Sequence, residues 1–288
     1  MACSRTSEYR KEMPEKKDKC FESFLFQSVN PAEPSWNALK VTWNVYTDVP
    51  RTQGEAEFNG WVPLIPGAKC NDNPKFKGLR YIKDGDMGVI PIYGQAGYIA
   101  GIQLGFPENY TPNPNNFPSP LLKNAEDILD GGNYYQTAYF TNPAKICEGR
   151  TAMEFALEGT GTELLLQSGP NPISDYVTIP YTQEDVNNTM WTEGQCFQTM
   201  GTHYWYNISK DMSCEEVYPM FLLYDNGELN AFGWTIPMDL GNVSRSIENP
   251  PPNFYPYVFK VVPDCLYGLG TLSTVHIYLK NNPAEIKC

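Results

Sequence analysis

Alternation of apolar and polar residues predicts the first β-strand over residues 39–46. Apolar side chains occupy every second position from Leu39 to Val45, and a period of two is typical of a half-buried strand. A second alternating segment begins at Met153, and two glycines separate it from an apolar run that ends at residue 166. We interpret residues 153–166 as a hairpin.

Turn residues predict two further hairpins. Asn226-Gly227 separates the apolar runs 221–223 and 229–232, and Asn-Gly between two such runs is the strongest short signal for a hairpin. Gly97, within residues 95–97, takes the same role earlier in the chain. Frequent turns together with 25 prolines, 23 glycines and 19 tyrosines favour short strands over long helices.

One segment has the pattern of a short helix. Ser119 is a suitable N-cap, Pro120 suits the first helical position, an apolar stripe follows, and Gly131 ends the segment. The segment that corresponds to it later in the chain, residues 257–262, has the pattern of a strand instead.

Four pairs of similar segments occur in the same order along the chain and predict a tandem duplication. Both segments of the last pair, 139–144 and 278–284, are followed closely by a cysteine, Cys147 and Cys288. We therefore expect a mainly β protein of two tandem homologous β-rich domains, each a sandwich or a partly open barrel, with few short helices. A polar tail (1–19) would precede copy one (20–148) and copy two (149–288). The four pairs are 26–28 with 166–168, 90–93 with 221–224, 116–123 with 253–260, and 139–144 with 278–284.

The charge of the chain excludes some partners. The net charge is −12 over 288 residues, and an acidic surface repels nucleic acid and anionic membranes. No apolar run approaches the roughly 18 residues of a membrane helix, so we expect no membrane span. The partner that we expect is a small molecule or a glycan.

Cysteines and glycosylation triplets favour an extracellular protein. Eight widely spread cysteines without CxxC pairs are typical of structural disulfides, and four Asn-X-Ser/Thr triplets begin at Asn109, Asn187, Asn207 and Asn242. The first residues lack the apolar segment of a signal peptide, so we expect a mature or recombinant form without its signal. Eight cysteines allow about 100 pairings, and the repeat predicts two of the bonds, Cys70–Cys147 and Cys196–Cys288. The two cysteines in segments where copy two is longer would form Cys214–Cys265, which leaves Cys3–Cys20.

Candidate chemistry centres on two histidines, His203 and His276, which both lie in copy two. The aligned copy-one residues are Arg80 and one near Thr137. The two imidazoles are either partly buried among aromatic residues or form a site for acid/base chemistry or for a metal. A metal would need a third ligand that the sequence does not identify, and no cofactor is indicated. The common signatures of hydrolases, zinc proteases and nucleotide-binding proteins are missing from the sequence.

The leading hypothesis is a secreted, disulfide-bonded glycoprotein that binds a small apolar ligand or a glycan. Aromatic clusters support it because their faces line pockets and stack on sugars. The alternative is an extracellular enzyme, an oxygen-using oxidoreductase or a hydrolase, with His203 and His276 as candidate catalytic residues. Because a disulfide between Cys214 and Cys265 would tie two loops beside the histidine strands, we expect a cavity in copy two. Its predicted lining is His203, Trp205, Tyr224, His276 and Tyr278.

Overall fold

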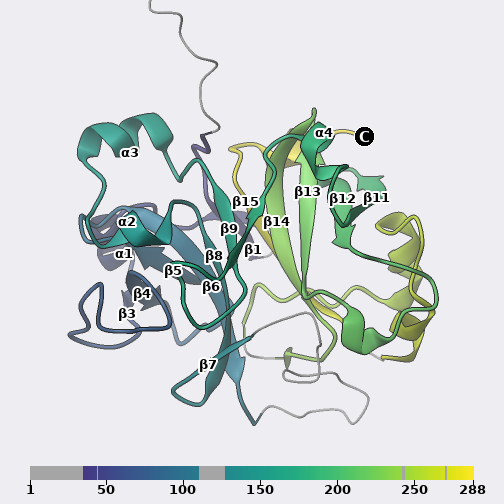
Figure 1. The fold of residues 1–288 in the computed structure, drawn as a ribbon, viewed down its shortest axis with the longest axis horizontal. Coiled ribbons are helices and arrows are strands. Elements are labelled where there is room, and N and C mark those ends of the chain that lie inside the picture. Colours follow the sequence, from purple (N-terminus) through teal and green to yellow (C-terminus); the bar gives the residue numbers. More distant parts are fainter. Residues whose placement is uncertain (1–34, 44, 110–126, 242–243, 270) are drawn as a thin grey trace, which may run out of the picture. The chain divides into compact units, whose positions relative to one another are not determined.

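Strands dominate the computed structural model, which describes residues 35–43, 45–109, 127–241, 244–269 and 271–288 (Figure 1). Short helices and 3₁₀ turns connect the strands, which confirms the prediction of a mainly β protein with few short helices. The helices are α1 (Gln53–Phe58), α2 (Pro143–Ile146), α3 (Ala152–Glu158) and α4 (Gln183–Val186), and the 3₁₀ turns are η1 (Cys214–Glu216), η3 (Pro252–Tyr257), η4 (Asp264–Gly268) and η5 (Pro283–Glu285).

The strands form two antiparallel sheets that do not close into barrels. The first sheet has the order β10-β9-β8-β6-β5-β4-β3, and β7 pairs with β8 beside this path. Its strands are β3 (Val62–Pro63), β4 (Leu79–Ile82), β5 (Ile90–Tyr93), β6 (Ile99–Pro107), β7 (Ile128–Asp130), β8 (Asn133–Tyr139), β9 (Leu164–Gln167) and β10 (Tyr176–Ile179).

The second sheet has the order β11-β12-β13-β14-β15-β1-β2. Each sheet therefore takes one hairpin from the other half of the chain: β9 and β10 extend the first sheet, and β1 and β2 extend the second. The strands of the second sheet are β1 (Lys40–Trp43), β2 (Val45–Asp48), β11 (Trp191–Phe197), β12 (Gly201–Tyr206), β13 (Met220–Asp225), β14 (Glu228–Ile236) and β15 (Ser273–Tyr278).

Corresponding hydrogen bonds recur in the two sheets. The hydroxyl of Tyr93 donates to the carbonyl of Pro50, and that of Tyr224 donates to the carbonyl of Pro180. These parallels favour the predicted duplication, but the division into copies 20–148 and 149–288 stays a prediction. Residues 34–288 form one compact unit, and the predicted tail 1–19 lies outside the described residues.

One large core contains residues from both sheets. Phe140 and Phe232 meet with ring centroids 6.2 Å apart, and the Trp36 indole donates to the carbonyl of Leu229 at 3.1 Å. Along the strands of the second sheet, side chains alternate between this core and the opposite face. Tyr204 and Leu222 point into the core, whereas their neighbours belong to a second cluster on what we call the pocket face, which includes Trp205, Phe221, Leu223 and Tyr278.

Helix α3 corrects the predicted hairpin over residues 153–166. Its first turn carries a capping box, in which the Thr151 side chain accepts from the backbone N–H of Glu154 and the Glu154 carboxylate accepts from that of Thr151. Met153 and Leu157 are spaced by one helical turn, and both are about three-quarters exposed. Their apolar alternation therefore does not reflect a buried sheet face, and the N-terminal cap decides the local structure. The apolar run that follows is strand β9, as expected for a strand.

Three other local predictions have mixed outcomes. The single strand over 39–46 is instead two strands, because Trp43 pairs with Val45 and the chain reverses between β1 and β2. Most of the predicted helix over 119–131 lies outside the described residues, and its described end is strand β7. The predicted strand over 257–262 is wrong, since η3 ends at Tyr257 and residues 258–262 contain no strand.

The two turn predictions are confirmed. Asn226 and Gly227 have φ values of 53° and 83° between β13 and β14, and positive φ at both central residues is the hairpin turn that Asn-Gly favours. Gly97 has a φ of 81° in the turn between β5 and β6.

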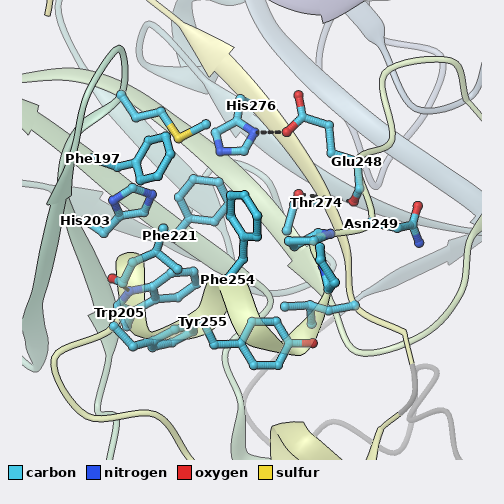
Figure 2. A pocket seen from close by; sticks show the side chains of 16 residues that line it. Phe197, His203, Trp205, Phe221, Glu248, Asn249, Phe254, Tyr255, Thr274 and His276 are labelled. Atoms are coloured by element: carbon cyan, nitrogen blue, oxygen red, sulfur yellow. Dashed lines mark hydrogen bonds and ion pairs between the residues drawn. The ribbon is translucent and has the colours of Figure 1, made fainter.

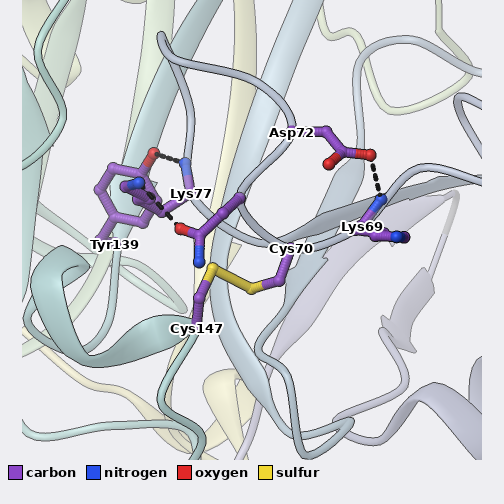
Figure 3. Close-up of a disulfide and its surroundings, with 7 residues drawn as sticks. Lys69, Cys70, Asp72, Lys77, Tyr139 and Cys147 are labelled. Carbon is purple, nitrogen blue, oxygen red and sulfur yellow. Dashed lines mark hydrogen bonds between the residues drawn. A yellow bond between two sulfur atoms is a disulfide. The ribbon is translucent and has the colours of Figure 1, made fainter.

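The described residues contain three disulfides, which are the three pairings predicted for these six cysteines: Cys70–Cys147, Cys196–Cys288 and Cys214–Cys265. Figure 3 shows the Cys70–Cys147 bond beside the loop in which Lys69 N–H donates to Asp72. The fourth predicted pair, Cys3–Cys20, lies outside the described residues.

Candidate ligand pocket

A cavity of about 310 Å³ opens on the pocket face of the second sheet (Figure 2). Its floor consists of side chains from β12, β13 and β15. Strands β12 and β13 are neighbours in the sheet, and β14 lies between β13 and β15. The segment around η3 covers this floor. Most of the lining is apolar, with Phe197, Met200, Trp205, Phe221, Phe254, Tyr255, Val258, Phe259 and Leu272 among its members.

Trp205 ties the covering segment to the sheet. Its indole N–H donates to the carbonyl of Val258 at 2.9 Å, and its ring stacks on Phe259 with centroids 3.9 Å apart. On the sheet itself, the ring lies 5.2 Å from Phe221. Trp205 therefore holds the cover in place while one part of its surface lines the cavity.

Glycine at position 233 makes room for Phe221. In the sheet, Phe221 pairs with Gly233, which pairs in turn with His276. A Cβ at Gly233 would collide with the Phe221 ring and with the carbonyl of Val275. Because this side chain is missing, the ring of Phe221 can lie across β14 towards β15.

His203 is neutral at physiological pH. The side chain is almost fully buried, and its Nδ1 lies 3.1 Å from the carbonyl of Gln195, so Nδ1 carries the proton and donates. Burial, assisted by the nearby His276, lowers the pKa of His203 to about 3. This imidazole therefore contributes an aromatic face to the pocket and no charge.

A His–carboxylate pair lies at the polar side of the pocket. His276 Nδ1 is 3.4 Å from Oε2 of Glu248, whose side chain is 38 % exposed. Burial raises the pKa of Glu248, but the contacts of its carboxylate with His276 and Thr42 outweigh this effect and lower the pKa, so Glu248 is ionised. Figure 2 shows Glu248, Thr274 and Asn249 on the His276 side, with Trp205 and Tyr255 farther away.

The two histidines share the pocket, but they do not meet. The Phe221 ring lies between them, with centroids 5.9 Å from His203 and 4.9 Å from His276 (Figure 2). Within the described ranges, no group of three or more His, Cys, Asp or Glu side chains could hold a metal ion. The arrangement suits two separate contacts to one bound molecule better than joint coordination.

Three of the five predicted lining residues face the cavity: His203, Trp205 and His276. Tyr224 and Tyr278 are not in the lining. Tyr224 points into the main core because it neighbours Leu223 in the alternation of β13. Tyr278 lies on the pocket face, but its ring packs edge-on against Tyr46 with centroids 5.0 Å apart.

Other lining residues come from the segment between β14 and β15. The aromatic cluster at Phe254 and Tyr255 is visible in the sequence and suggests ligand contact, but it does not indicate which strands it covers. Glu248 has no local signal, since it reaches the sheet through a single bridge to Thr274.

Three of the four glycosylation triplets begin at exposed asparagines, Asn109, Asn187 and Asn207. The side-chain oxygen of Asn187 accepts a hydrogen bond from the hydroxyl of Tyr204. The side-chain nitrogen, to which an N-linked glycan is attached, takes no part in this hydrogen bond. Asn242 lies outside the described residues.

Comparison with protein families, curated proteins and solved structures found no match to this chain. None of the helices in the described ranges is long and apolar enough to cross a membrane. Three internal disulfides are consistent with an extracellular protein.

Proposed function

We propose that this protein is a secreted, disulfide-bonded glycoprotein that binds a small apolar ligand on the pocket face of the second sheet. The observation that carries the proposal is the cavity of about 310 Å³ with its mostly aromatic and aliphatic lining. Small-molecule sites have volumes of roughly 300–1,000 Å³, apolar walls and a few placed polar groups. Here, the polar groups gather on one side, around His276 and Glu248.

The character of the walls favours an apolar ligand over a glycan. A sugar presents hydroxyl groups around its ring, and burying them without hydrogen bonds is costly. The pocket offers polar side chains mainly at Glu248, Asn249, Thr274 and His276, while the far side is formed by Trp205 and its aromatic neighbours. A flat apolar molecule with one polar end fits this distribution.

A thermal-shift screen tests the proposal, because a ligand that binds only the native state raises the melting temperature. Tryptophol, 2-naphthol and decanol serve as apolar probes, and chitobiose serves as the glycan. We expect stabilisation by at least one apolar probe and none by chitobiose. Stabilisation by chitobiose alone, or by no probe, would contradict the proposal.

A matched pair of variants assigns the binding to this pocket. Val258→Trp places a large ring in the cavity and should abolish the shift. Val261→Trp makes the same exchange three residues later, at a side chain that is 45 % exposed and outside the lining. It should keep the shift of the unmodified protein.

Secretion with glycosylation is supported by the disulfides and by the exposed asparagines at which three triplets begin, Asn109, Asn187 and Asn207. Expression in a secreting eukaryotic cell tests it. We expect a mass decrease after enzymatic removal of N-linked glycans, whereas an unchanged mass would contradict glycosylation.

The enzyme alternative remains a second proposal because of one observation. The 3.4 Å contact between His276 and Glu248 resembles the base–carboxylate part of a hydrolase site. Hydrolysis of a panel of chromogenic esters tests this proposal. Turnover that disappears in His276→Gln but persists in His203→Gln would support the proposal. If the unmodified protein hydrolyses the esters no faster than the His276→Gln variant, the proposal is contradicted.

A further inference from the structure

Arg80 and His203 occupy corresponding positions in the two sheets. Arg80 on β4 pairs with Ile92, the residue before Tyr93, and His203 on β12 pairs with Leu223, the residue before Tyr224. The hydroxyls of these two tyrosines make the corresponding hydrogen bonds described above. The surroundings of Arg80 in the first sheet can therefore be compared with the pocket around His203 in the second sheet.

In the first sheet, this place is filled by a cation held between aromatic rings and a carboxylate. The guanidinium carbon of Arg80 lies 4.7 Å from the ring centroid of Phe76 and 5.1 Å from that of Tyr135. Its Nη2 is 3.2 Å from the Asp130 carboxylate. Aromatic faces attract cations through their quadrupole, and this attraction strengthens when water is excluded, as it is for the Arg80 side chain, which is 5 % exposed.

The pocket of the second sheet also has aromatic rings and a carboxylate, although its rings come from register positions other than that of Tyr135. Phe221 and Trp205 lie on the floor of the pocket, and Glu248 lies at its polar side. Glu248 bridges to Thr274 on β15, and Asp130 lies on β7, which pairs with β8. Each carboxylate therefore comes from a segment beside the corresponding strand, although by register Glu248 corresponds to Ile128, two residues before Asp130. His203, which replaces Arg80, is buried and uncharged, and neither lysine nor arginine is among the lining residues that the structure describes.

We propose that the pocket binds a small aromatic molecule that carries a protonated amine, with its ring against Trp205 and Phe221 and its ammonium group beside Glu248. The ammonium would supply the positive charge that Arg80 provides in the first sheet. A carboxylate has about four lone-pair positions, so the contact with His276 leaves room for this second partner. The inference rests on the proposed function, because it names the chemical class that the same pocket would bind.

Matched indole compounds test the charge preference at constant ring size. Isothermal titration calorimetry at pH 7 and low salt measures the dissociation constants of tryptamine, tryptophol and indole-3-acetate, which carry an ammonium, a hydroxyl and a carboxylate group, respectively. We expect tryptamine to have a dissociation constant about tenfold below that of tryptophol, because a cation gains both the carboxylate and the aromatic faces. Indole-3-acetate should bind more weakly than tryptophol.

Two carboxylate-to-amide variants locate the preference. Glu248→Gln removes the charge at the pocket and should give tryptamine and tryptophol equal affinities. Glu228→Gln makes the same change at a half-exposed carboxylate that pairs with Lys280 away from the pocket, and it should keep the tenfold preference.

The outcomes separate this inference from the proposed function. If tryptophol binds as tightly as tryptamine, or if the preference survives Glu248→Gln, the amine assignment is overturned while the apolar pocket stands. If none of the indole compounds binds and no apolar probe raises the melting temperature in the thermal-shift screen, both the amine assignment and the proposed function are overturned.

Discussion

Gly233→Ala tests whether the floor of the pocket depends on the missing side chain at this position. The new Cβ would collide with the Phe221 ring and with the carbonyl of Val275 on the neighbouring strand. The ring can rotate away, but the backbone carbonyl belongs to the ladder between β14 and β15 and cannot move without weakening it. The ring must therefore shift towards the cavity or the strands must separate.

The magnitude follows from two opposing effects. Forcing an extra methyl group into a packed region costs typically about 1–3 kcal/mol, whereas replacing glycine lowers the entropy of the unfolded chain and stabilises by about 0.4–1 kcal/mol. We expect a net loss of about 1–2 kcal/mol in the free energy of unfolding. For a chain of this size, each kcal/mol lowers the melting temperature by about 2–4 °C.

Chemical denaturation and titration with tryptophol measure the two consequences. Gly54→Ala is the control, because Gly54 lies in helix α1 with no atom near the position of the new Cβ, and this exchange should stabilise slightly. Gly233→Ala should lower both the unfolding free energy and the affinity for tryptophol. Equal stability of the two variants, with unchanged binding, would refute the role assigned to Gly233.

Three further predictions concern the surroundings of the pocket. Replacing both Cys214 and Cys265 by serine opens a bridge that spans 51 residues, which by chain entropy should cost about 4 kcal/mol in chemical denaturation; a loss below 1 kcal/mol would contradict this. Trp205→Phe removes the indole donor to the Val258 carbonyl, which keeps the N–H of Gln195 as a second donor, and it should cost about 0.5–1.5 kcal/mol, whereas unchanged stability would show that the contact does not hold the cover. Because the pKa of His203 is about 3 when folded and about 6.5 when unfolded, only the unfolded chain gains this proton as the pH falls below 6.5. Between pH 7 and pH 5, the unmodified protein should therefore lose about 2 kcal/mol more stability than His203→Gln, and equal losses would contradict the burial of this histidine.

Covalent and turn features could be predicted because their signals are local or collinear. Asn226-Gly227 requires a particular backbone, and the structure has it. Two disulfides, Cys70–Cys147 and Cys196–Cys288, could be predicted because the proposed repeat places one pair of cysteines at matching positions in each half of the chain. His203 and Trp205 share a strand face because they are two residues apart.

Features that depend on distant contacts could not be predicted. The alternation from Met153 to Leu157 fits a strand and a helix almost equally well, and the capping box at Thr151 decides between them. The exchange of hairpins between the sheets leaves no periodic signal, because β1 and β2 would have the same pattern next to any strand. Glu248 became part of the site through a single bridge to Thr274, which no local pattern indicates.

The two histidines offer the most direct test of the pocket, because the chain contains no others and both line the cavity. Labelling histidine with ¹³C at Cε1 should give two NMR signals, one from His203 and one from His276, and these can be followed during a titration with tryptamine. We predict that both signals shift and saturate with one common dissociation constant, and that Val258→Trp abolishes both shifts. Binding of tryptamine in calorimetry with neither histidine signal moving would place the ligand elsewhere and contradict the account.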